Sequence, residues 1–547
     1  MESAELDNLD NKAVEKTGIR YEQAVCAIAF ILAVIVAVWL RFDRIGVKPF
    51  HHDEGVNSHF LLNLANHGEY KYNPENYHGP TLYYIDLPVL RVFGENDFAL
   101  RFTPALFGVL TVLMVWLLRR RLGPIGTPVA AFLMALSPGL VYFSRDFIHE
   151  MSFGCFSLGI VVGAWRYAES KNFSWLALTA TSAGLLFATK ETAIITAAVM
   201  IIAALCAEAW EIRRRLAALG DVSPAAFARE FRRDCAELAP SLDHALAAVM
   251  IFVFINIFFY SSFFTNWHGV PDAVKSVFLW TGRRNSEHQK DFLYYIGVLF
   301  KLELPLLIGS LLAGIFIVRR GTRFWLFVAA WTLGLTLAYS IIKYKTPWLM
   351  ISFLIPMALL SGHAAQRIYD AASLISIRLL CAAALVAILI LNVRLTRTVN
   401  FEKYDDNSND SGYLTRARRN LDLIPDDDGL YGYVYAQTDR DIFELIKAIK
   451  SETDKLPSGV DTPIYLAMPE YWPLPWYLRD YKNASFSGKL PDTDGGPPQL
   501  SQPIIIANVN QQSILNAMPG WRESPRAFKL RPGVELVIYV RDVAEQR

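Results

Sequence analysis

The sequence lacks an excess of charge of either sign and carries few cysteines. Its 53 Lys and Arg residues nearly cancel its 52 Asp and Glu residues, so it has no basic surplus of the kind typical of nucleic-acid-binding proteins. The five cysteines show no metal-ligand spacing and fall in apolar runs or in one basic loop; they are Cys26, Cys155, Cys206, Cys235 and Cys381. The sequence therefore predicts no nucleic-acid partner, and it predicts cysteines that are small core residues or unreactive thiols.

Three further features are missing. The first apolar run, residues 24–40, ends in Arg-Phe-Asp-Arg without a small-residue cleavage site, which indicates a retained helix rather than a signal peptide. No internal repeat is evident along the chain. No glycine-rich phosphate motif opens a helix after residue 400, so we expect no nucleotide site there.

Long apolar runs dominate the first 400 residues. Hydrophobic residues make up 53% of the chain, which is too many for a wholly soluble protein of this length. A membrane-spanning helix needs about 20 mostly apolar residues, because the hydrocarbon layer is roughly 30 Å thick and each residue rises 1.5 Å. The candidate runs, several of them short, are residues 24–40, 102–118, 125–143, 151–165, 175–188, 192–207, 245–264, part of 292–318, 324–342, 348–360 and 379–391. We predict a polytopic α-helical membrane protein with about 11 transmembrane helices.

Basic residues fall in every second loop between these runs. Lys and Arg in short loops stay preferentially on the cytoplasmic side of a membrane. The loops that the rule assigns to that side hold residues 119–121, Lys171, residues 213–233, Arg319, Arg320, Arg323 and Arg367. This pattern predicts a multi-pass protein of the cell membrane with a cytoplasmic N-terminus and, because the helix count is odd, an external C-terminal segment.

The chain is expected to have three regions. Residues 1–20 form a cytoplasmic segment, residues 21–398 form the transmembrane domain with an external loop at 42–100, and residues 399–547 form an external soluble α/β domain. In the last region, strand-like and amphipathic helical patterns alternate. The predicted strands are residues 429–436, 463–467, 503–509 and 534–540, and the predicted helices are residues 441–453 and 511–518.

The first external loop is long and rich in polar residues. It carries His51-His52-Asp53-Glu54-Gly55, followed by His59, His67 and His78. Two adjacent acids beside two histidines could bind a metal ion or supply a general base for a hydroxyl nucleophile. The same composition also fits a solvated amphipathic loop at the membrane surface, and both interpretations stay open at this point.

The second external loop, residues 144–150, holds four ionisable groups between two apolar helices. If this loop is helical, Asp146 and Glu150 share one face, while Arg145 and His149 share the neighbouring one. Either face could line a polar site. The alternative is an interfacial cap that contains an internal Arg–carboxylate pair.

Two lysine-containing segments lie in predicted external loops, where basic residues are otherwise sparse. They are Thr189-Lys190-Glu191-Thr192 and Lys343-Tyr344-Lys345-Thr346-Pro347-Trp348. Either segment alone fits anchoring at the membrane interface. Together with Arg145, and beside carboxylate-rich loops, they favour convergence on one anionic ligand such as a phosphate.

These segments together resemble the GT-C glycosyltransferase superfamily, in particular the dolichyl-phosphate-mannose protein mannosyltransferases and the lipid A aminoarabinose transferases. The shared features are the Asp53-Glu54 pair after the first helix, the Arg101-containing entry to the second helix at residues 98–108, Ser144-Arg145-Asp146, and the Lys-Tyr-Lys-Thr-Pro segment at residues 343–347. The combination also resembles a prokaryotic branch sometimes labelled as flippase-associated. The resemblance covers roughly residues 20–400 and implies a GT-C-like transmembrane catalytic domain.

The resemblance implies transfer of a sugar, for example a hexose such as mannose, from a polyprenyl-phosphate carrier to a hydroxyl acceptor on the outer membrane face. It implies Asp53 as the general base, with Glu54 orienting it or the acceptor. The expected donor-phosphate contacts are Arg145, Lys190, Lys343 and Lys345, and the expected substrate contacts are His52, His78, Asp146, Glu150 and Tyr344. Some GT-C enzymes use a divalent cation and others do not; the candidate ligands here are Asp53, Asp146 and Glu150.

Two other classes of protein remain as alternatives. A transporter or flippase for lipid-linked sugars needs ionisable groups or broken helices near the bilayer midplane. Here the charges cluster at helix ends except for Lys301 and Glu303, and Pro305 after them indicates an interfacial helix that leads into a span. The second class is a sensor whose external α/β domain binds a ligand. A sensor function gives the carboxylates of the external loops no role. Because the chain lacks the long luminal domain of the protein mannosyltransferases, the acceptor stays open between glycan, protein and lipid.

Overall fold

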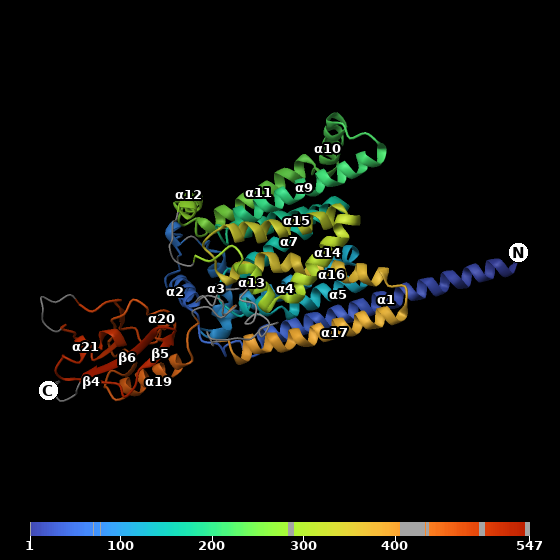
Figure 1. Ribbon diagram of the computed structural model, residues 1–547. Helices are drawn as coiled ribbons and strands as arrows, with labels where there is room; N and C mark the ends of the chain where they lie inside the picture. Colours follow the sequence, from blue (N-terminus) through green and yellow to red (C-terminus); the bar gives the residue numbers. More distant parts are fainter. Residues whose placement is uncertain are drawn as a thin grey trace.

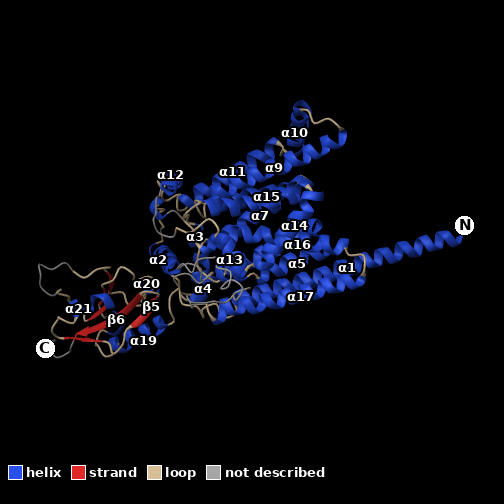
Figure 2. Ribbon diagram, viewed as in Figure 1, coloured by secondary structure: helices blue, strands red, loops and turns tan. Residues whose placement is uncertain are grey.

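The structure is a computed structural model that describes residues 2–68, 70–76, 78–282, 289–404, 433, 437–491 and 498–541. Long helices form a bundle, and all the strands of the described chain lie in a smaller C-terminal domain (Figure 2). That domain sits at one end of the bundle (Figure 1). The predicted division into a helical part and an α/β part is therefore confirmed, whereas the predicted boundaries of the three regions stay predictions.

The helices occupy most of the first 400 residues. The first half of the bundle contains α1 (Glu2–Phe42), α2 (His52–His67), α3 (Thr81–Phe93), α4 (Asp97–Met114), α5 (Arg119–Leu136), α6 (Pro138–Phe143), α7 (Glu150–Ser170), α8 (Phe173–Phe187) and α9 (Ala193–Leu219). The second half contains α10 (Pro224–Leu238), α11 (Leu242–Tyr260), α12 (Gly269–Gly282), α13 (Tyr294–Leu302), α14 (Leu304–Arg320), α15 (Arg323–Ile341), α16 (Ile351–Ala371) and α17 (Ile375–Arg397). Short turns of helix are η1 (Pro74–Asn76), η2 (Val115–Leu118), η3 (Pro347–Met350) and η4 (Thr398–Glu402). Helix dominates because hydrocarbon leaves backbone polar groups no partner outside the chain.

The structure supports a multi-pass protein. Within the described chain, seven helical segments are long and apolar enough to cross a membrane, or eight if α13 and α14, bent by 108°, form one span. One of the seven, Asp97–Leu136, contains the predicted run 102–118 and the first part of the run 125–143, and its path bends at Gly123, whose φ is 79°. Helices α7 and α8 coincide in sequence with two further predicted runs, residues 151–165 and 175–188. The count of about eleven spans stays a prediction.

One predicted span, residues 125–143, is interrupted. Helix α5 ends at Leu136 and α6 starts at Pro138, because a proline ring fits the first turn of a helix but cannot continue the preceding one. The buried Arg41 guanidinium donates hydrogen bonds to the carbonyl oxygens of Met134 (3.1 Å) and Ala135 (3.3 Å). Arg41 thus satisfies carbonyl groups that the end of α5 leaves without helical partners.

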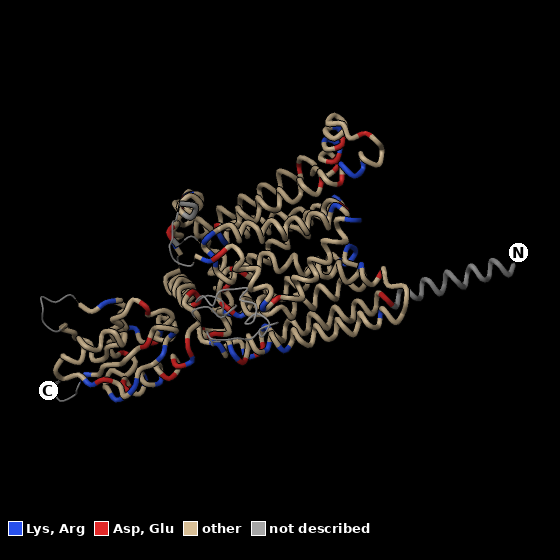
Figure 3. Tube along the Cα trace, viewed as in Figure 1, with Lys and Arg blue, Asp and Glu red and all other residues tan. Residues whose placement is uncertain are grey.

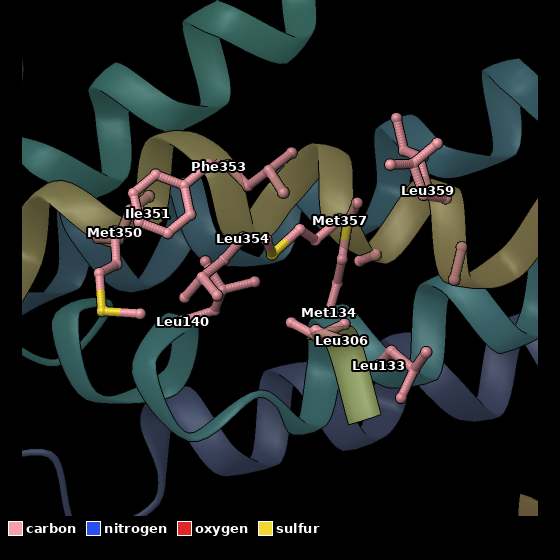
Figure 4. Close-up of a cluster of buried hydrophobic side chains, with 14 of the residues drawn as sticks. Leu133, Met134, Leu140, Leu306, Met350, Ile351, Phe353, Leu354, Met357 and Leu359 are labelled. Carbon is pink, nitrogen blue, oxygen red and sulfur yellow. The ribbon is translucent and has the colours of Figure 1, made fainter. Parts of the chain in front are cut away.

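Helix α16 is the centre of the bundle and packs against α5, α7, α14 and α15. Figure 4 shows Met357 of α16 beside Met134 of α5 and Leu306 of α14, and all three side chains are buried. Helices α5 and α16 cross where Gly126 meets Gly362, since a Cβ built on Gly126 would lie 2.6 Å from the Gly362 carbonyl oxygen. Small residues allow such a close crossing, and close packing is what holds helices together in lipid.

Charged residues gather at the two ends of the bundle and on the C-terminal domain (Figure 3). The N-terminus and α10 lie at one end, whereas α2, α12 and the C-terminal domain lie at the other (Figure 1). The first external loop and the C-terminal domain are therefore on the same side of the bundle, as predicted from loop charge. Which end faces the cytoplasm stays a prediction.

The C-terminal domain is built on a six-stranded sheet. Its strands are β1 (Ile464–Leu466), β2 (Ala484–Phe486), β3 (Ile504–Asn508), β4 (Trp521–Glu523), β5 (Phe528–Arg531) and β6 (Val534–Arg541). The order is β2-β1-β3-β6-β4, with β5 also paired to β6. Strand β1 runs parallel to β2 and β3, whereas β3, β4 and β5 run antiparallel to β6.

Both faces of this sheet are covered. Helix α19 (Asp441–Thr453) packs its buried Ile442, Leu445 and Ile449 against one face, together with α20 (Leu474–Tyr477). The turn η5 (Gly459–Asp461) lies between α19 and β1, and the turn η6 (Val509–Gln511) lies between β3 and α21 (Gln512–Leu515). Leu515 of α21 belongs to the core on the opposite face of the sheet.

Most of the described part of this domain matches the sequence predictions. The predicted helix 441–453 and the strands predicted at 463–467, 503–509 and 534–540 are confirmed. The helix predicted at 511–518 is shorter, and the strand predicted at 429–436 lies outside the described residues except for Tyr433. The sequence missed β2, β4 and β5, because strands of three or four residues are too short to show an alternating pattern.

Candidate functional site

The beginning of α2 places two neighbouring acids in different surroundings. His51 caps the helix: its Nδ1 accepts a hydrogen bond from the Asp53 amide (3.2 Å), and its own amide donates to Glu54 Oε2 (2.9 Å). This reciprocal arrangement satisfies amide groups that have no partner in the first helical turn. It also directs the side chains of Asp53 and Glu54 to different sides of the helix start.

Glu54 is completely buried and belongs to a dense network. Arg101 of α4 donates to both of its carboxylate oxygens, at 2.7 and 2.8 Å, and the Phe147 amide donates to Oε1 at 2.8 Å. Burial alone would raise the pKa of Glu54, but the Arg101 guanidinium outweighs burial and the pKa is lowered. Glu54 therefore joins α2, α4 and the loop after α6, and it is not available to take a proton from a substrate.

Asp53 faces a narrow cleft at the same end of the bundle. The residues that line the cleft are His51, Asp53, Tyr142, Phe143, Asp146, Ile148, Trp348, Tyr433 and Gln437. The Asp53 carboxylate makes no hydrogen bond or ion pair with any other residue that the structure describes. Among the predicted site acids in the described chain, Asp53 alone combines a place in the cleft with an unpaired carboxylate.

Asp146 also lines the cleft, but it is paired. Its carboxylate accepts a hydrogen bond from the Lys48 ammonium, and both side chains are buried. The Lys48 nitrogen also lies 3.7 Å from the centre of the Tyr142 ring, as expected for a cation–π contact. Burial raises the pKa of Asp146 and lowers the pKa of Lys48, while the opposite charge of the partner counteracts both shifts. Sequence reasoning missed Lys48, although its position three residues before His51 was a usable signal.

A second polar cluster lies where the α7 start meets the loop between α8 and α9. Lys190 Nζ is 2.5 Å from Glu150 Oε1, and both side chains are buried. His78 Nδ1 is 3.2 Å from Glu191 Oε2. Burial would raise the pKa of Glu191, but the neighbouring His78 and then Lys190 lower it. The structure thus brings together three predicted residues, Lys190, Glu150 and His78, from segments far apart in the sequence.

Tyr344 links this cluster to Asp53. Burial raises its pKa most, the positive charge of Lys190 lowers it, and the negative charges of Asp53 and Glu150 raise it further. Tyr344 therefore lies within electrostatic range of both the cleft and the Lys190 cluster. Lys343 beside it is exposed, and its ammonium group makes no ion pair with a residue that the structure describes.

Two other predicted residues, Arg145 and Lys345, donate hydrogen bonds within the protein. Arg145 donates hydrogen bonds to the carbonyl oxygens of Leu40 (2.9 Å), Asp43 (2.7 Å) and Arg44 (2.9 Å) at the end of α1. Lys345 donates to the carbonyl oxygens of Lys290 (3.0 Å) and Ile342 (2.5 Å).

His52 turns away from the cleft towards the C-terminal domain. Its Nδ1 lies 3.5 Å from an Arg531 nitrogen. Burial lowers the pKa of His52 to about 4. The negative charge of Asp53 opposes this shift, whereas the positive charges of His51 and Arg531 add to it. The predicted substrate-binding role of His52 and the phosphate-binding roles of Arg145 and Lys345 stay predictions that these contacts do not favour.

The candidate metal ligands do not form a metal-binding set. Lys48 and Lys190 already neutralise Asp146 and Glu150, and no group of three His, Cys, Asp or Glu side chains with metal-site geometry occurs in the described ranges. A divalent cation would require these ion pairs to open. We therefore derive no catalytic step through a metal.

Comparisons with known sequences match parts of the chain. The sequence family described as dolichyl-phosphate-mannose-protein mannosyltransferase matches residues 77–224. A protein of Aquifex aeolicus (strain VF5) is 31% identical over 172 residues, which are 29% of this chain and 34% of that protein. The aligned segment thus spans about a third of the length of this relative.

Solved structures extend the likeness to nearly the whole chain. ArnT from Cupriavidus metallidurans, bound to undecaprenyl phosphate, superimposes with a TM-score of 0.55 at 14% identity, covering 94% of this chain and 97% of that one. AglB, the oligosaccharyltransferase of Archaeoglobus fulgidus, in complex with an inhibitory peptide and a dolichol-phosphate, superimposes with a TM-score of 0.50 at 13% identity, covering 89% of this chain and 70% of that one. The chain therefore shares the fold of these two proteins, which agrees with the resemblance stated from the sequence.

Proposed function

We propose that the chain is an integral membrane glycosyltransferase that transfers a sugar from a polyprenyl-phosphate carrier to a hydroxyl acceptor at the outer face of the membrane. The observation that carries this proposal is the Asp53 carboxylate, which has no partner in the described part of the chain and lies in a cleft whose other acid, Asp146, is neutralised by Lys48. The fold supports it, since structures of this fold have been solved with undecaprenyl phosphate and with a dolichol-phosphate. The sugar, for which mannose is an example, and the acceptor are not specified by these contacts.

The chemistry needs one base and a stabilised leaving group. The Asp53 carboxylate accepts the proton of the acceptor hydroxyl while the oxygen forms a bond to the anomeric carbon. The bond between that carbon and the phosphate oxygen breaks, and the polyprenyl phosphate leaves with the electron pair. Because phosphate is a good leaving group, cationic stabilisation replaces a general acid.

We assign the donor phosphate to Lys190, Lys343 and Tyr344, which are not among the residues that line the cleft. Lys190 is buried beside Glu150, and Tyr344 lies within electrostatic range of both Lys190 and Asp53. A lysine supplies a compact positive charge that suits a phosphate. In this proposal the sugar lies between the leaving phosphate and the Asp53 carboxylate.

Replacing Asp53 tests the proposal most directly. Asp53→Asn keeps the size and polarity of the side chain but removes the base, so transfer from a labelled polyprenyl-phosphate sugar should fall by about 10²–10⁴-fold. Binding of the donor should stay at the parental level, because Asp53 is not among the assigned phosphate contacts. Asp480→Asn, on the exposed surface of the C-terminal domain, is the matched control and should retain activity.

A transporter for lipid-linked sugars is the second candidate. One observation favours it: the bend of 108° between α13 and α14 places Glu303, a buried carboxylate, at a broken helix. Glu303 is nevertheless satisfied locally, since it accepts hydrogen bonds from Ser137 Oγ (2.7 Å) and the Gly139 amide (2.9 Å). A folded Asp53→Asn protein that transfers sugar at the parental rate would make the transporter the better proposal.

A further inference from the structure

The chain that leads into α2 is held from two directions. We call residues 47–51 the entry segment, since they connect α1 to the cap of the helix that carries Asp53. From the membrane side, Arg101 donates to the carbonyl oxygens of Lys48 (2.8 Å) and Pro49 (3.3 Å). The same guanidinium holds Glu54, so one buried cation connects the entry segment with the first turn of α2.

From the other direction, the entry segment is held by residues beyond the membrane helices. Gln437 Nε2 donates to the Pro49 carbonyl oxygen at 2.8 Å. Thr438 Oγ1 donates to the Phe50 carbonyl oxygen at 2.6 Å, and the Phe50 amide donates to the Tyr477 hydroxyl at 2.8 Å. Both backbone polar groups of the residue that precedes the helix cap are therefore satisfied by the C-terminal domain.

Packing reinforces these hydrogen bonds. The rings of Phe50 and Trp476 stack at a centroid distance of 5.1 Å with planes only 5° apart, and both are buried. Trp476 Nε1 also donates to Asp97 Oδ1 at the start of α4 (2.9 Å). In the first turn of α2, a Cβ built on Gly55 would lie 2.7 Å from Pro473 Cβ. The helix start thus rests directly on the segment around α20.

The C-terminal part also contributes to the cleft itself. Tyr433 and Gln437 are among its lining residues, and the Tyr433 hydroxyl donates to Glu303 at 3.0 Å. Because the Asp53 carboxylate has no partner among the described residues, the backbone must fix its position. A loose base would sample geometries that cannot reach the acceptor hydroxyl, and misplacement by about 1 Å can cost roughly 10²-fold in rate.

We propose that the C-terminal domain positions Asp53 for catalysis by holding both backbone polar groups of Phe50 through Thr438 and Tyr477. These two are positioning residues, since they act on Asp53 through the entry segment. The inference rests on the proposed function, which makes Asp53 the base. The domain is accordingly part of the active site rather than a separate binding module.

Isosteric substitutions test this role. Thr438→Val keeps the shape of the side chain but removes the hydroxyl, and it should lower kcat roughly ten- to a hundred-fold with little change in KM for the donor. Thr438→Ser restores the hydroxyl and should recover most of the rate. Thr453→Val removes another buried hydroxyl of the same domain, one that bonds within the domain to Lys450 and Tyr481, and should leave kcat unchanged.

A double-mutant comparison separates positioning from general destabilisation. In an Asp53→Asn background, Thr438→Val should cause no further loss of rate, because there is no base left to misplace. A loss of equal size in both backgrounds would overturn the inference, as would a parental kcat for Thr438→Val alone. If Thr438→Val does not fold, Tyr477→Phe is used instead, with Tyr465→Phe, whose hydroxyl bonds to Ser487 and Lys489, as its control.

Amide hydrogen exchange gives a readout that does not depend on the reaction. Thr438→Val should increase exchange at residues 50–54 selectively, with the sheet unchanged. If the parental protein transfers no sugar but this selective increase is found, the proposed function fails while the positioning contact stands. If the parental protein is active and exchange at residues 50–54 is unaltered, the positioning inference fails while the proposed function stands.

Discussion

At the scale of single residues, two adjacent acids have opposite roles. Asp53 faces the cleft without a partner among the described residues, whereas Glu54 is enclosed by Arg101, the His51 amide and the Phe147 amide. A buried ion pair with saturated hydrogen bonds loses much more when one partner is removed than it contributed as a pair. The two acids should therefore respond very differently to the same chemical change.

Glu54→Gln should impair folding rather than turnover. The substitution leaves the Arg101 charge buried without its counter-ion, which costs about 3–5 kcal/mol. We expect a large loss of folded protein in detergent, measured by size-exclusion chromatography and thermal unfolding. Asp53→Asn should elute and melt like the parental protein. A Glu54→Gln protein of parental stability would contradict the assignment of Glu54 to the structural network.

The ion pair of Glu54 and Arg101 leads us to expect a loss of stability in acid. Because the pKa of Glu54 is lowered in the folded state, its contribution is complete above the ordinary carboxylate pKa of about 4.3 and is lost as the pH falls through the lower folded value. The parental protein should therefore lose thermal stability below about pH 4.3, and Glu54→Gln should show a smaller part of that loss. An identical acid transition in both proteins would assign the acid sensitivity to other groups.

At the scale of elements, the segment between α15 and η3 holds Lys343 and Lys345 in different surroundings. Tyr344 pairs with Gln289 in an isolated antiparallel bridge, and the Lys290 amide donates to the Lys343 carbonyl oxygen at 3.1 Å. Lys345 points into this pairing and donates to the Lys290 carbonyl oxygen, whereas Lys343 is exposed. The segment thus leaves Lys343 exposed and buries Lys345, whose ammonium group is held by the two carbonyl oxygens.

Replacing the two lysines should separate binding from structure. Lys343→Ala removes an exposed ammonium group and should raise the donor KM several-fold, because charge-assisted contacts to a phosphate are lost. Lys345→Ala should instead lower the melting temperature, since two carbonyl oxygens lose their donor. Donor titrations and thermal unfolding of both variants measure this. The reverse pattern would place Lys345, as the sequence suggested, at the phosphate.

At the scale of the whole molecule, the two ends of the helical bundle carry different parts of the chain. The N-terminus and α10 lie at the opposite end of the bundle from α2 and the C-terminal domain (Figure 1). The cleft of Asp53 lies at the end that carries the C-terminal domain, because Tyr433 and Gln437 line it. The side of the membrane on which the C-terminal domain resides therefore decides where the proposed reaction takes place.

Reporter fusions test this orientation. The alternating basic loops predict a cytoplasmic N-terminus and an external C-terminal domain. A reporter that is active only in the cytoplasm should be silent when it is fused after residue 541 and active when it is fused before residue 22. The same reporter placed in the loop between α9 and α10 should also be active. Activity at the C-terminal fusion would move the proposed reaction to the cytoplasmic face.

The sequence by itself determined the helical architecture, the approximate positions of the apolar runs and the main elements of the C-terminal sheet. These features are readable because hydrophobic length and periodicity are local properties of a chain. The sequence also indicated Asp53, through its resemblance to GT-C enzymes, and it indicated that several charged loops gather at one end. It grouped Asp53 with Glu54, Asp146 and Glu150 because all four carry the same charge in similar loops.

Only the tertiary structure distinguished these acids. Arg101 lies 47 residues after Glu54, Lys48 lies 98 residues before Asp146, and Lys190 lies 40 residues after Glu150. No local pattern reveals which buried cation neutralises which acid, because that depends on how the helices pack. The same holds for Thr438, which lies 388 residues after Phe50. Long-range packing thus connected the Asp53 helix to the C-terminal domain and brought no described residue to the Asp53 carboxylate, because a side chain gains a partner only where the fold brings one within a few ångströms.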